Sequence, residues 1–230
     1  MTPLTGATDQ AGISTPALWS PLRGRKRSLA DALADPRVRL GAGTGALLVT
    51  AVALRRDRVG RCEAAAFRAV NGLPGWLYPP AWAVMQLGSF GAIPVSAAAA
   101  WLARDRELAV LLLIGGTGTW ALSKAVKQVV RRPRPVTLLR GVRRRGRDAT
   151  GLGYLSGHAG VAVALGAAAL PRLGPGGRAV TLLAIPLVGL TRVYVGAHFP
   201  LDIAGGAALG LAVNVAAGAV VSRCSARGRG

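Results

Sequence analysis

The apolar residues of this chain gather in long uncharged runs. The run 203–222 has no charged residue, and at about 1.5 Å per residue it can cross a hydrocarbon core of roughly 30 Å. The run 69–103 is also uncharged, but the segment NGLPG at 71–75 and the Pro-Pro pair at 79–80 interrupt its first third. Because Gly and Pro break helices, a helix is expected there only over about 81–103.

The remaining apolar runs complete a pattern of membrane spans. Residues 108–123 are apolar, and the predicted helix continues to 130 with Lys124 and Lys127 facing a polar interior, since a lysine facing lipid is costly. Three shorter apolar runs, at 40–54, 159–170 and 179–191, are counted as spans together with their flanking residues. The chain is therefore expected to have an all-α fold, a polytopic membrane bundle of about six transmembrane helices. The expected spans lie near 38–56, 81–103, 108–130, 155–171, 178–194 and 201–222.

Three parts of the chain differ in polarity. Residues 1–36 are polar and contain proline, so they are expected to form a disordered N-terminal tail, and the late first apolar run is unlike a cleaved secretory signal. Residues 37–222 are expected to form the membrane domain, and 223–230 a short basic tail. Gly206 and Gly210 have the spacing G-x-x-x-G, which suits close helix packing, although a composition with 32 Gly explains the match equally well.

Composition excludes several classes of protein. The 29 Lys and Arg against 9 Asp and Glu give a net charge of +20, yet 51% of residues are hydrophobic, which excludes disorder of the whole chain. Two cysteines cannot build a disulfide scaffold. Basic residues before the first span favour a cytoplasmic N-terminus. Lys and Arg are nearly balanced between the two predicted sides, so charge bias does not set the orientation.

The chain has two histidines, and the first follows a Ser-Gly pair. Ser156 and Gly157 precede His158 at the expected start of an apolar helix. Free backbone N–H groups at such a start bind anions. Taken alone, a Ser-Gly pair is more often a simple helix cap.

The second histidine lies beside a carboxylate. His198 precedes Pro200, which suits the first turn of a helix, so Asp202 is expected about one turn away and within reach of the ring. A carboxylate at one ring nitrogen keeps the other unprotonated, which prepares a nucleophilic or basic histidine. Arg192 lies shortly before it, where a lone arginine is usually an interfacial anchor.

Basic residues follow the predicted span 108–130. Lys127 offers a point charge and Arg134 a planar fork, which together can hold several oxygens of one phosphate. Arg192 would add a third cation. The neighbouring Arg131 and Arg132 are expected to be rim charges.

These three clusters, in this order, resemble the type-2 phosphatidic acid phosphatase family, which includes bacterial lipid phosphate phosphatases and vanadium haloperoxidases. The resemblance covers about 71–214 and also implies a six-helix membrane bundle. Two positions depart from the family pattern, Leu155 for proline and Thr191 for serine. The matches are K-x6-R-P at Lys127, Arg134 and Pro135, with the common inner Arg-Pro at Arg132 and Pro133; S-G-H at Ser156, Gly157 and His158; and R-x5-H-x3-D at Arg192, His198 and Asp202.

The resemblance implies a mechanism. His198 would attack phosphorus and become a phosphohistidine, Asp202 would fix its tautomer, and His158 would protonate the leaving group and then activate water. No metal or other cofactor is implied, and Asp202 and Asp148 are the carboxylates expected near the clusters, too few for a two-metal site. The phosphate would be held by Lys127, Arg134, Ser156, the Gly157 N–H and Arg192.

The resemblance also implies partners and location. The expected partners are a lipid phosphate and the bilayer, with no nucleic acid, and the oligomeric state is not readable. Phosphatidic acid, phosphatidylglycerol phosphate and polyprenyl phosphate or diphosphate are all open as substrates. The family usually faces its site outward with both termini inside, which implies a cell-membrane protein with cytoplasmic termini. Tyr78, Trp76 and Trp82 are expected to form an interfacial belt and not a substrate site.

Two other functional classes remain open. A vanadate-dependent haloperoxidase would share the motif residues, but those enzymes are soluble and longer. A non-enzymatic protein that binds membrane surfaces or nucleic acid would use the charge of +20 and the arginine-rich run 140–147. This second alternative leaves both histidine motifs unexplained.

Overall fold

The computed structural model describes residues 35–54, 59–146 and 150–227, and every regular element in these ranges is helical. The all-α prediction is confirmed. The expected tail lies, except for its last two residues, outside the described residues, as do Asp148 and the end of the first predicted span. The elements are α2 (Pro36–Ala53), α3 (Arg61–Asn71), η1 (Gly75–Leu77), α4 (Tyr78–Gln86), α5 (Ala92–Leu102), α6 (Arg106–Val130), α7 (Pro135–Leu138), α8 (Gly157–Ala169), η2 (Leu170–Arg172), α9 (Pro175–Tyr194) and α10 (Pro200–Arg227).

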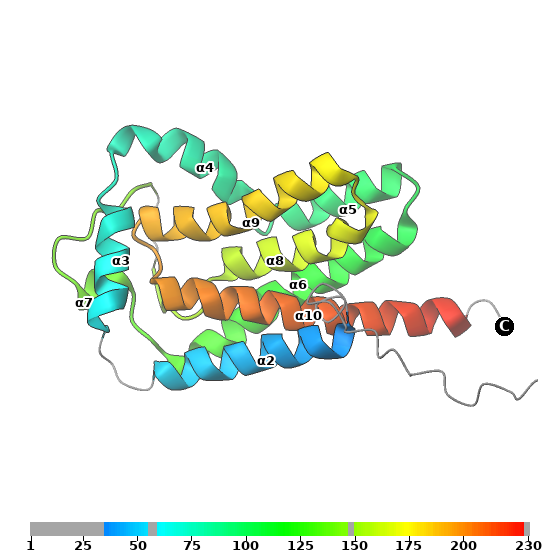
Figure 1. The fold of residues 1–230 in the computed structure, drawn as a ribbon, viewed down its shortest axis with the longest axis horizontal. Helices are drawn as coiled ribbons and strands as arrows, with labels where there is room; N and C mark the ends of the chain where they lie inside the picture. Colours follow the sequence, from blue (N-terminus) through cyan, green and yellow to red (C-terminus); the bar gives the residue numbers. More distant parts are fainter. Residues whose placement is uncertain (1–34, 55–58, 147–149, 228–230) are drawn as a thin grey trace, which may run out of the picture.

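Helix α10 runs through the middle of the bundle. It packs against α2, α6 and α8, while α9 packs on α8 and α4, and α5 packs on α6. The short helices α3 and α7 lie together at one end (Figure 1). At the opposite end α2 begins and α10 finishes, so the described chain starts and stops on the same side of the bundle.

Helix length and lipid-facing side chains support a membrane protein. Among the described residues, three segments are long and apolar enough to span a bilayer, Arg106–Leu138, Pro175–Tyr194 and Pro200–Arg227. Large apolar side chains point outward from other helices too, such as Val49 on α2 and Val95 on α5, which are 68% and 70% exposed. By contrast, α8 is largely buried within the bundle. The predicted number of about six spans is therefore approximate.

The predicted span 81–103 is wrong as a single helix. The chain instead forms α4 and α5, which are separated by turns at 87–91. Gly88 lies in this break against the backbone of α8, where a Cβ atom would come within 2.3 Å of the His158 carbonyl oxygen. This close approach requires glycine and places α4 beside the start of α8.

Two further boundaries differ from expectation. The amphipathic helix α3 was not predicted, because its charged residues break the apolar pattern; its Phe67 side chain is 1% exposed and packs in the core. The C-terminal tail was predicted from 223, but α10 continues to Arg227. The basic Arg227 in this last turn suits the negative end of the helix dipole.

Glycines on α10 allow it to lie directly on α8. A Cβ atom on Gly206 would come within 2.3 Å of the Ser156 carbonyl, and one on Gly210 within 2.2 Å of the Gly160 carbonyl. The interpretation of the G-x-x-x-G spacing as a close-packing surface is confirmed. The consequence for function is that the start of α8 meets the start of α10, where the Ser156 N–H donates to the carbonyl of Asp202 at 2.9 Å.

Candidate active site

A cavity of about 450 Å³ opens at the end of the bundle where α3 and α7 lie. The end of α6, the start of α8 and the end of α9 meet there. Three residues predicted to act on phosphate, Arg134, His158 and Arg192, line this cavity. Segments far apart in the sequence therefore contribute to one site.

His198 does not itself line the cavity but follows Ala197, which does. The His198 side chain is 3% exposed. Burial lowers the pKa of His198 to about 3; the cations of Arg192 and Lys127 act in the same direction, and Asp202 opposes them. The ring is therefore neutral near pH 7, which is the state a nucleophile needs.

Asp202 faces the His198 ring but is held by other donors. Its Oδ2 atom lies 3.6 Å from His198 Nδ1, a separation too long for a hydrogen bond. Oδ2 accepts the Phe199 N–H at 2.8 Å, and Oδ1 accepts from Arg132 Nη1 at 2.8 Å. Within the described part of the chain, His198 Nδ1 has no hydrogen-bond partner. Asp202 therefore lies beside the His198 ring as predicted, but the two side chains do not form a hydrogen bond.

The start of α8 combines a helix cap with the second histidine. Ser156 is fully buried, and its side chain accepts the Ala159 N–H at 3.4 Å as the N-cap. Gly157 fits closely, since a Cβ atom there would lie 3.1 Å from Ser123 Oγ. His158 is half-buried and close enough to His198 for positive charges on the two rings to repel each other.

Lys127 holds the segment that leads into α8. Its Nζ donates to the carbonyls of Leu155 at 2.5 Å, Gly153 at 3.1 Å and Leu152 at 3.3 Å. The prediction of a polar interior is confirmed for Lys127 and wrong for Lys124, which is exposed and lies over the Trp120 ring. Because an ammonium has three donors, Lys127 would have to exchange one carbonyl to bind a phosphate oxygen.

The two arginines of the cavity differ in their bonding. Arg134 Nη1 donates to the Ala197 carbonyl at 2.8 Å, which ties the exit of α6 to the residue before His198. Arg192 Nη1 approaches Met85 Sδ at 2.6 Å. The buried Nε of Arg192 has no hydrogen-bond partner among the described residues. Its N–H group can therefore donate a hydrogen bond to a ligand in the cavity.

The prediction that Arg132 is a rim charge is wrong. Its side chain is 5% exposed and pairs with both Asp202 and Glu63. Glu63, the second partner of Arg132, lies on α3. Arg132 lies in the inner Arg-Pro of the first motif, which marks the position but not its ion pairs, whereas nothing in the sequence around Glu63 marks that carboxylate.

Aromatic and basic side chains also line the cavity. Tyr78 and Trp82 line the cavity, while Trp76 is 74% exposed; the interfacial belt stays a prediction. Within the arginine-rich run, Arg145 donates to backbone carbonyls, including that of Tyr194 at 2.6 Å, so this side chain is held against α9.

The described residues also bear on metals. Among them, no group of three or more His, Cys, Asp and Glu side chains is arranged to hold a metal ion. Metal independence stays a prediction.

Comparison with known proteins adds to this geometry. The model of the PAP2 superfamily matches residues 107–225, which include all three motif clusters. The chain belongs to the PAP2 superfamily. As a PAP2 protein it is an integral-membrane phosphatase, a hydrolase of phosphoric esters.

Two solved PAP2-like structures share the fold. The crystal structure of Aquifex aeolicus LpxE is 22% identical and has a TM-score of 0.61, covering 67% of this chain and 93% of that one. The first transmembrane PAP2 type phosphatidylglycerolphosphate phosphatase from Bacillus subtilis is 22% identical with a TM-score of 0.60, covering 81% and 97%. No curated protein matches the chain.

Proposed function

We propose that this PAP2 protein is a lipid phosphate phosphatase that works without a metal ion and through a phosphohistidine at His198. One observation carries the proposal: His158, Arg134 and Arg192 come from separate segments and line one cavity, together with Ala197, the residue before the buried His198. The alternative of a purely basic membrane-surface protein gives no reason for this convergence.

The first chemical step forms the covalent intermediate. Nε2 of neutral His198 bonds to phosphorus while the bond from phosphorus to the lipid oxygen breaks. Protonated His158 gives its proton to the departing oxygen, and Asp202 stabilises the imidazolium. Catalytic hydrogen bonds are often long in an empty site and tighten when substrate binds, so the 3.6 Å separation of His198 and Asp202 is compatible with this role.

The second step releases phosphate. His158, now neutral, removes a proton from water as the water oxygen attacks phosphorus and the bond to His198 breaks. Inorganic phosphate leaves and both histidines return to their starting states. Throughout, Arg134, Arg192 and Lys127, together with Ser156 and the Gly157 N–H, are proposed to face the phosphoryl oxygens, because phosphoryl transfer depends mainly on positioning and charge stabilisation.

A lipid is the substrate class that fits the surroundings of the cavity. Tyr78 and Trp82 form part of its wall, and α9, whose end reaches the cavity, carries outward apolar side chains such as Leu183, which is 66% exposed. A lipid phosphate could place its head group in the cavity while its chains stay beside the helices. Phosphatidic acid, phosphatidylglycerol phosphate and polyprenyl phosphate or diphosphate are the candidates.

The experiment is phosphate release from these four lipids by the purified protein in detergent. We expect at least one to be hydrolysed, His198→Ala to lower the rate by at least about a thousandfold because the nucleophile is removed, and EDTA to leave turnover intact. Arg140→Ala, at an exposed residue of the basic run, is the matched control and should keep activity. Equal rates in His198→Ala and the original protein, or loss with EDTA that one divalent ion restores, would contradict the proposal.

We also propose that the site faces outward and that both termini are cytoplasmic. Support comes from the position of the cavity at the end opposite the start of α2 and the finish of α10 (Figure 1). Cys62 on α3 and Cys224 on α10 are both exposed and near opposite ends. A maleimide that cannot cross membranes should label Cys62 in intact cells and Cys224 only after permeabilisation; the reverse pattern would invert the topology.

A further inference from the structure

The buried Arg132 lies between two carboxylates from distant parts of the chain. Its Nη1 donates to Asp202 Oδ1 at 2.8 Å and to Glu63 Oε1 at 3.2 Å, and its Nη2 donates to Glu63 Oε2 at 2.7 Å. The guanidinium carbon also lies 4.5 Å from the centre of the Phe199 ring. A planar fork held by two carboxylates and an aromatic face has one orientation.

Glu63 also reaches the start of the helix that carries Asp202. Its Oε1 accepts the Leu201 N–H at 3.1 Å, while Asp202 itself accepts the Phe199 N–H at 2.8 Å. The first N–H groups of a helix have no partner within the helix. Glu63, from α3, thus holds both the first turn of α10 and Arg132, which donates to Asp202.

Charge explains why the network contains two carboxylates. All three side chains are at most 9% exposed, so their charges act with little screening by water. If Arg132 faced Asp202 alone, it would largely neutralise the carboxylate. With Glu63 balancing Arg132, the three groups carry one net negative charge, beside the ring that becomes positive when His198 is phosphorylated.

We propose that Glu63 and Arg132 are positioning residues for the His198–Asp202 pair. Arg132 fixes the Asp202 carboxylate, and Glu63 orients Arg132 and preserves the negative charge available to His198. Glu63 lies outside the three motif matches, whereas Arg132 belongs to the inner Arg-Pro of the first one, and the proposal rests on the function proposed for His198.

The test compares Glu63→Gln with two other variants. Glu63→Gln keeps the shape but removes the charge, and we expect kcat to fall about tenfold to a hundredfold with little change in KM, since a charged hydrogen bond acting on the transition state is lost. In an Asp202→Asn background the same change should have little further effect, because Glu63 acts through Asp202. Glu107→Gln, at the exposed carboxylate paired with Arg172, should leave kcat unchanged.

A purely structural role predicts a different result. Glu63→Gln would then lower the unfolding temperature but leave kcat per folded molecule unchanged, or its effect would add fully to that of Asp202→Asn. Either outcome overturns the proposal. If Glu63→Gln does not fold, Glu63→Asp keeps the charge but shortens the reach, and it should give a smaller loss of kcat with the same dependence on Asp202.

Binding of orthovanadate separates this proposal from the proposed function. Vanadate mimics a phosphoryl group in transfer, and we expect Glu63→Gln to weaken its binding about tenfold or more, while Glu107→Gln does not. If the original protein hydrolyses no lipid phosphate but binds vanadate with this dependence, the positioning role stands and the proposed function fails. If vanadate binds equally to both variants, or not at all, the positioning role fails.

Discussion

Two arginines of this chain each bridge two carboxylates, at opposite ends of the bundle. Arg132 lies at the end with the cavity and its side chain is 5% exposed, whereas Arg172 lies at the other end and is 39% exposed. The two clusters contain the same chemical groups. Their difference in burial shows that only the first is able to act strongly on a neighbouring group, because water screens the second.

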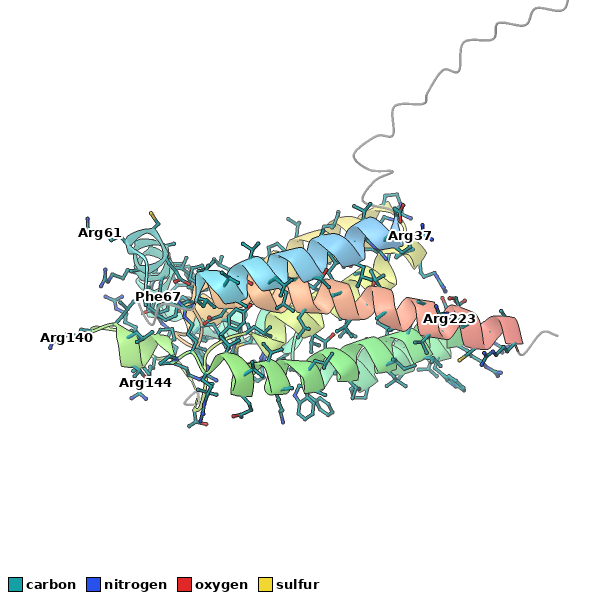
Figure 2. The ribbon with its side chains drawn as sticks, turned by 90° about the horizontal axis from the view of Figure 1, so that it is seen from below. Arg37, Arg61, Phe67, Arg140, Arg144 and Arg223 are labelled. Carbon is teal, nitrogen blue, oxygen red and sulfur yellow. The ribbon has the colours of Figure 1, made fainter. Side chains whose placement is uncertain are left out.

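The exposed cluster has the features of a surface ion pair. Arg172 contacts Asp105, which caps α6, and lies 3.5 Å from Glu107. The charges lie at the end where α2 begins and α10 finishes. In Figure 2, Arg37 and Arg223 are further basic residues toward this end, and Arg61, Arg140 and Arg144 lie at the end with the cavity. Both ends of the bundle are therefore basic, and burial rather than charge distinguishes them.

The largest expected effect is the removal of the buried cation. Arg132→Met should lower the free energy of unfolding by about 3–5 kcal/mol, because Glu63 and Asp202 would stay buried without a positive partner. Denaturant unfolding in detergent measures this change. Replacing all three residues by apolar ones should restore much of the loss; a loss below about 1 kcal/mol in Arg132→Met would show that the cluster is not buried.

The next effect is a dependence of stability on pH that differs between the two ends. Burial lowers the pKa of His198 to about 3. Below about pH 6.5, His198 therefore binds a proton in the unfolded chain but not in the folded protein. Stability should then fall by up to about 1.4 kcal/mol per pH unit as the pH drops from about 6.5 toward 3. His198→Gln should remove this part of the fall.

Asp105 should act in a lower pH window. The N–H of Leu108 and then Arg172 hold the pKa of Asp105 below its usual value of 3.8. Its stabilising effect is thus present above that value and lost as the pH falls through the lowered pKa. Thermal unfolding of Asp105→Asn and His198→Gln across pH 3–8 separates the two windows; identical curves would contradict the assignment.

The smallest effect is expected at the exposed cation. Arg172→Gln should change the free energy of unfolding by less than about 1 kcal/mol, since surface ion pairs contribute little. The change should shrink further at high salt, which screens exposed charges. A loss as large as that of Arg132→Met would mean that exposure does not decide the difference between the clusters.

Much of the site could be predicted because it depends on short-range patterns. The segments at His158 and His198 contain a helix cap and an i, i+4 pair, and these are set by neighbouring residues. Arg132 was misassigned because it follows α6 in a run of exposed-looking basic residues, and its partners are 69 and 70 residues away. Because these partners are distant in the sequence, no local pattern could predict the ion pairs that allow Arg132 to be buried.

The break within 81–103 was missed for a related reason. Hydropathy records how apolar a run is, and the residues of α4 and α5 are apolar on both sides of the turn. The turn depends on Gly88 meeting the backbone at His158, a contact that no local pattern contains. Tyr78 and Trp82, which line the cavity, lie on α4 just before this turn.

By itself, the sequence determined the helical class, the apolar segments that prefer lipid, and the histidines, arginines and lysine available for phosphate chemistry. These follow from side-chain transfer energies and local backbone preferences, which act over a few residues. Only the tertiary structure decided that Glu63 of α3 binds the start of α10 and that Arg132 is buried between Glu63 and Asp202. The physical reason is that a charge becomes buried or exposed through the packing of distant helices around it.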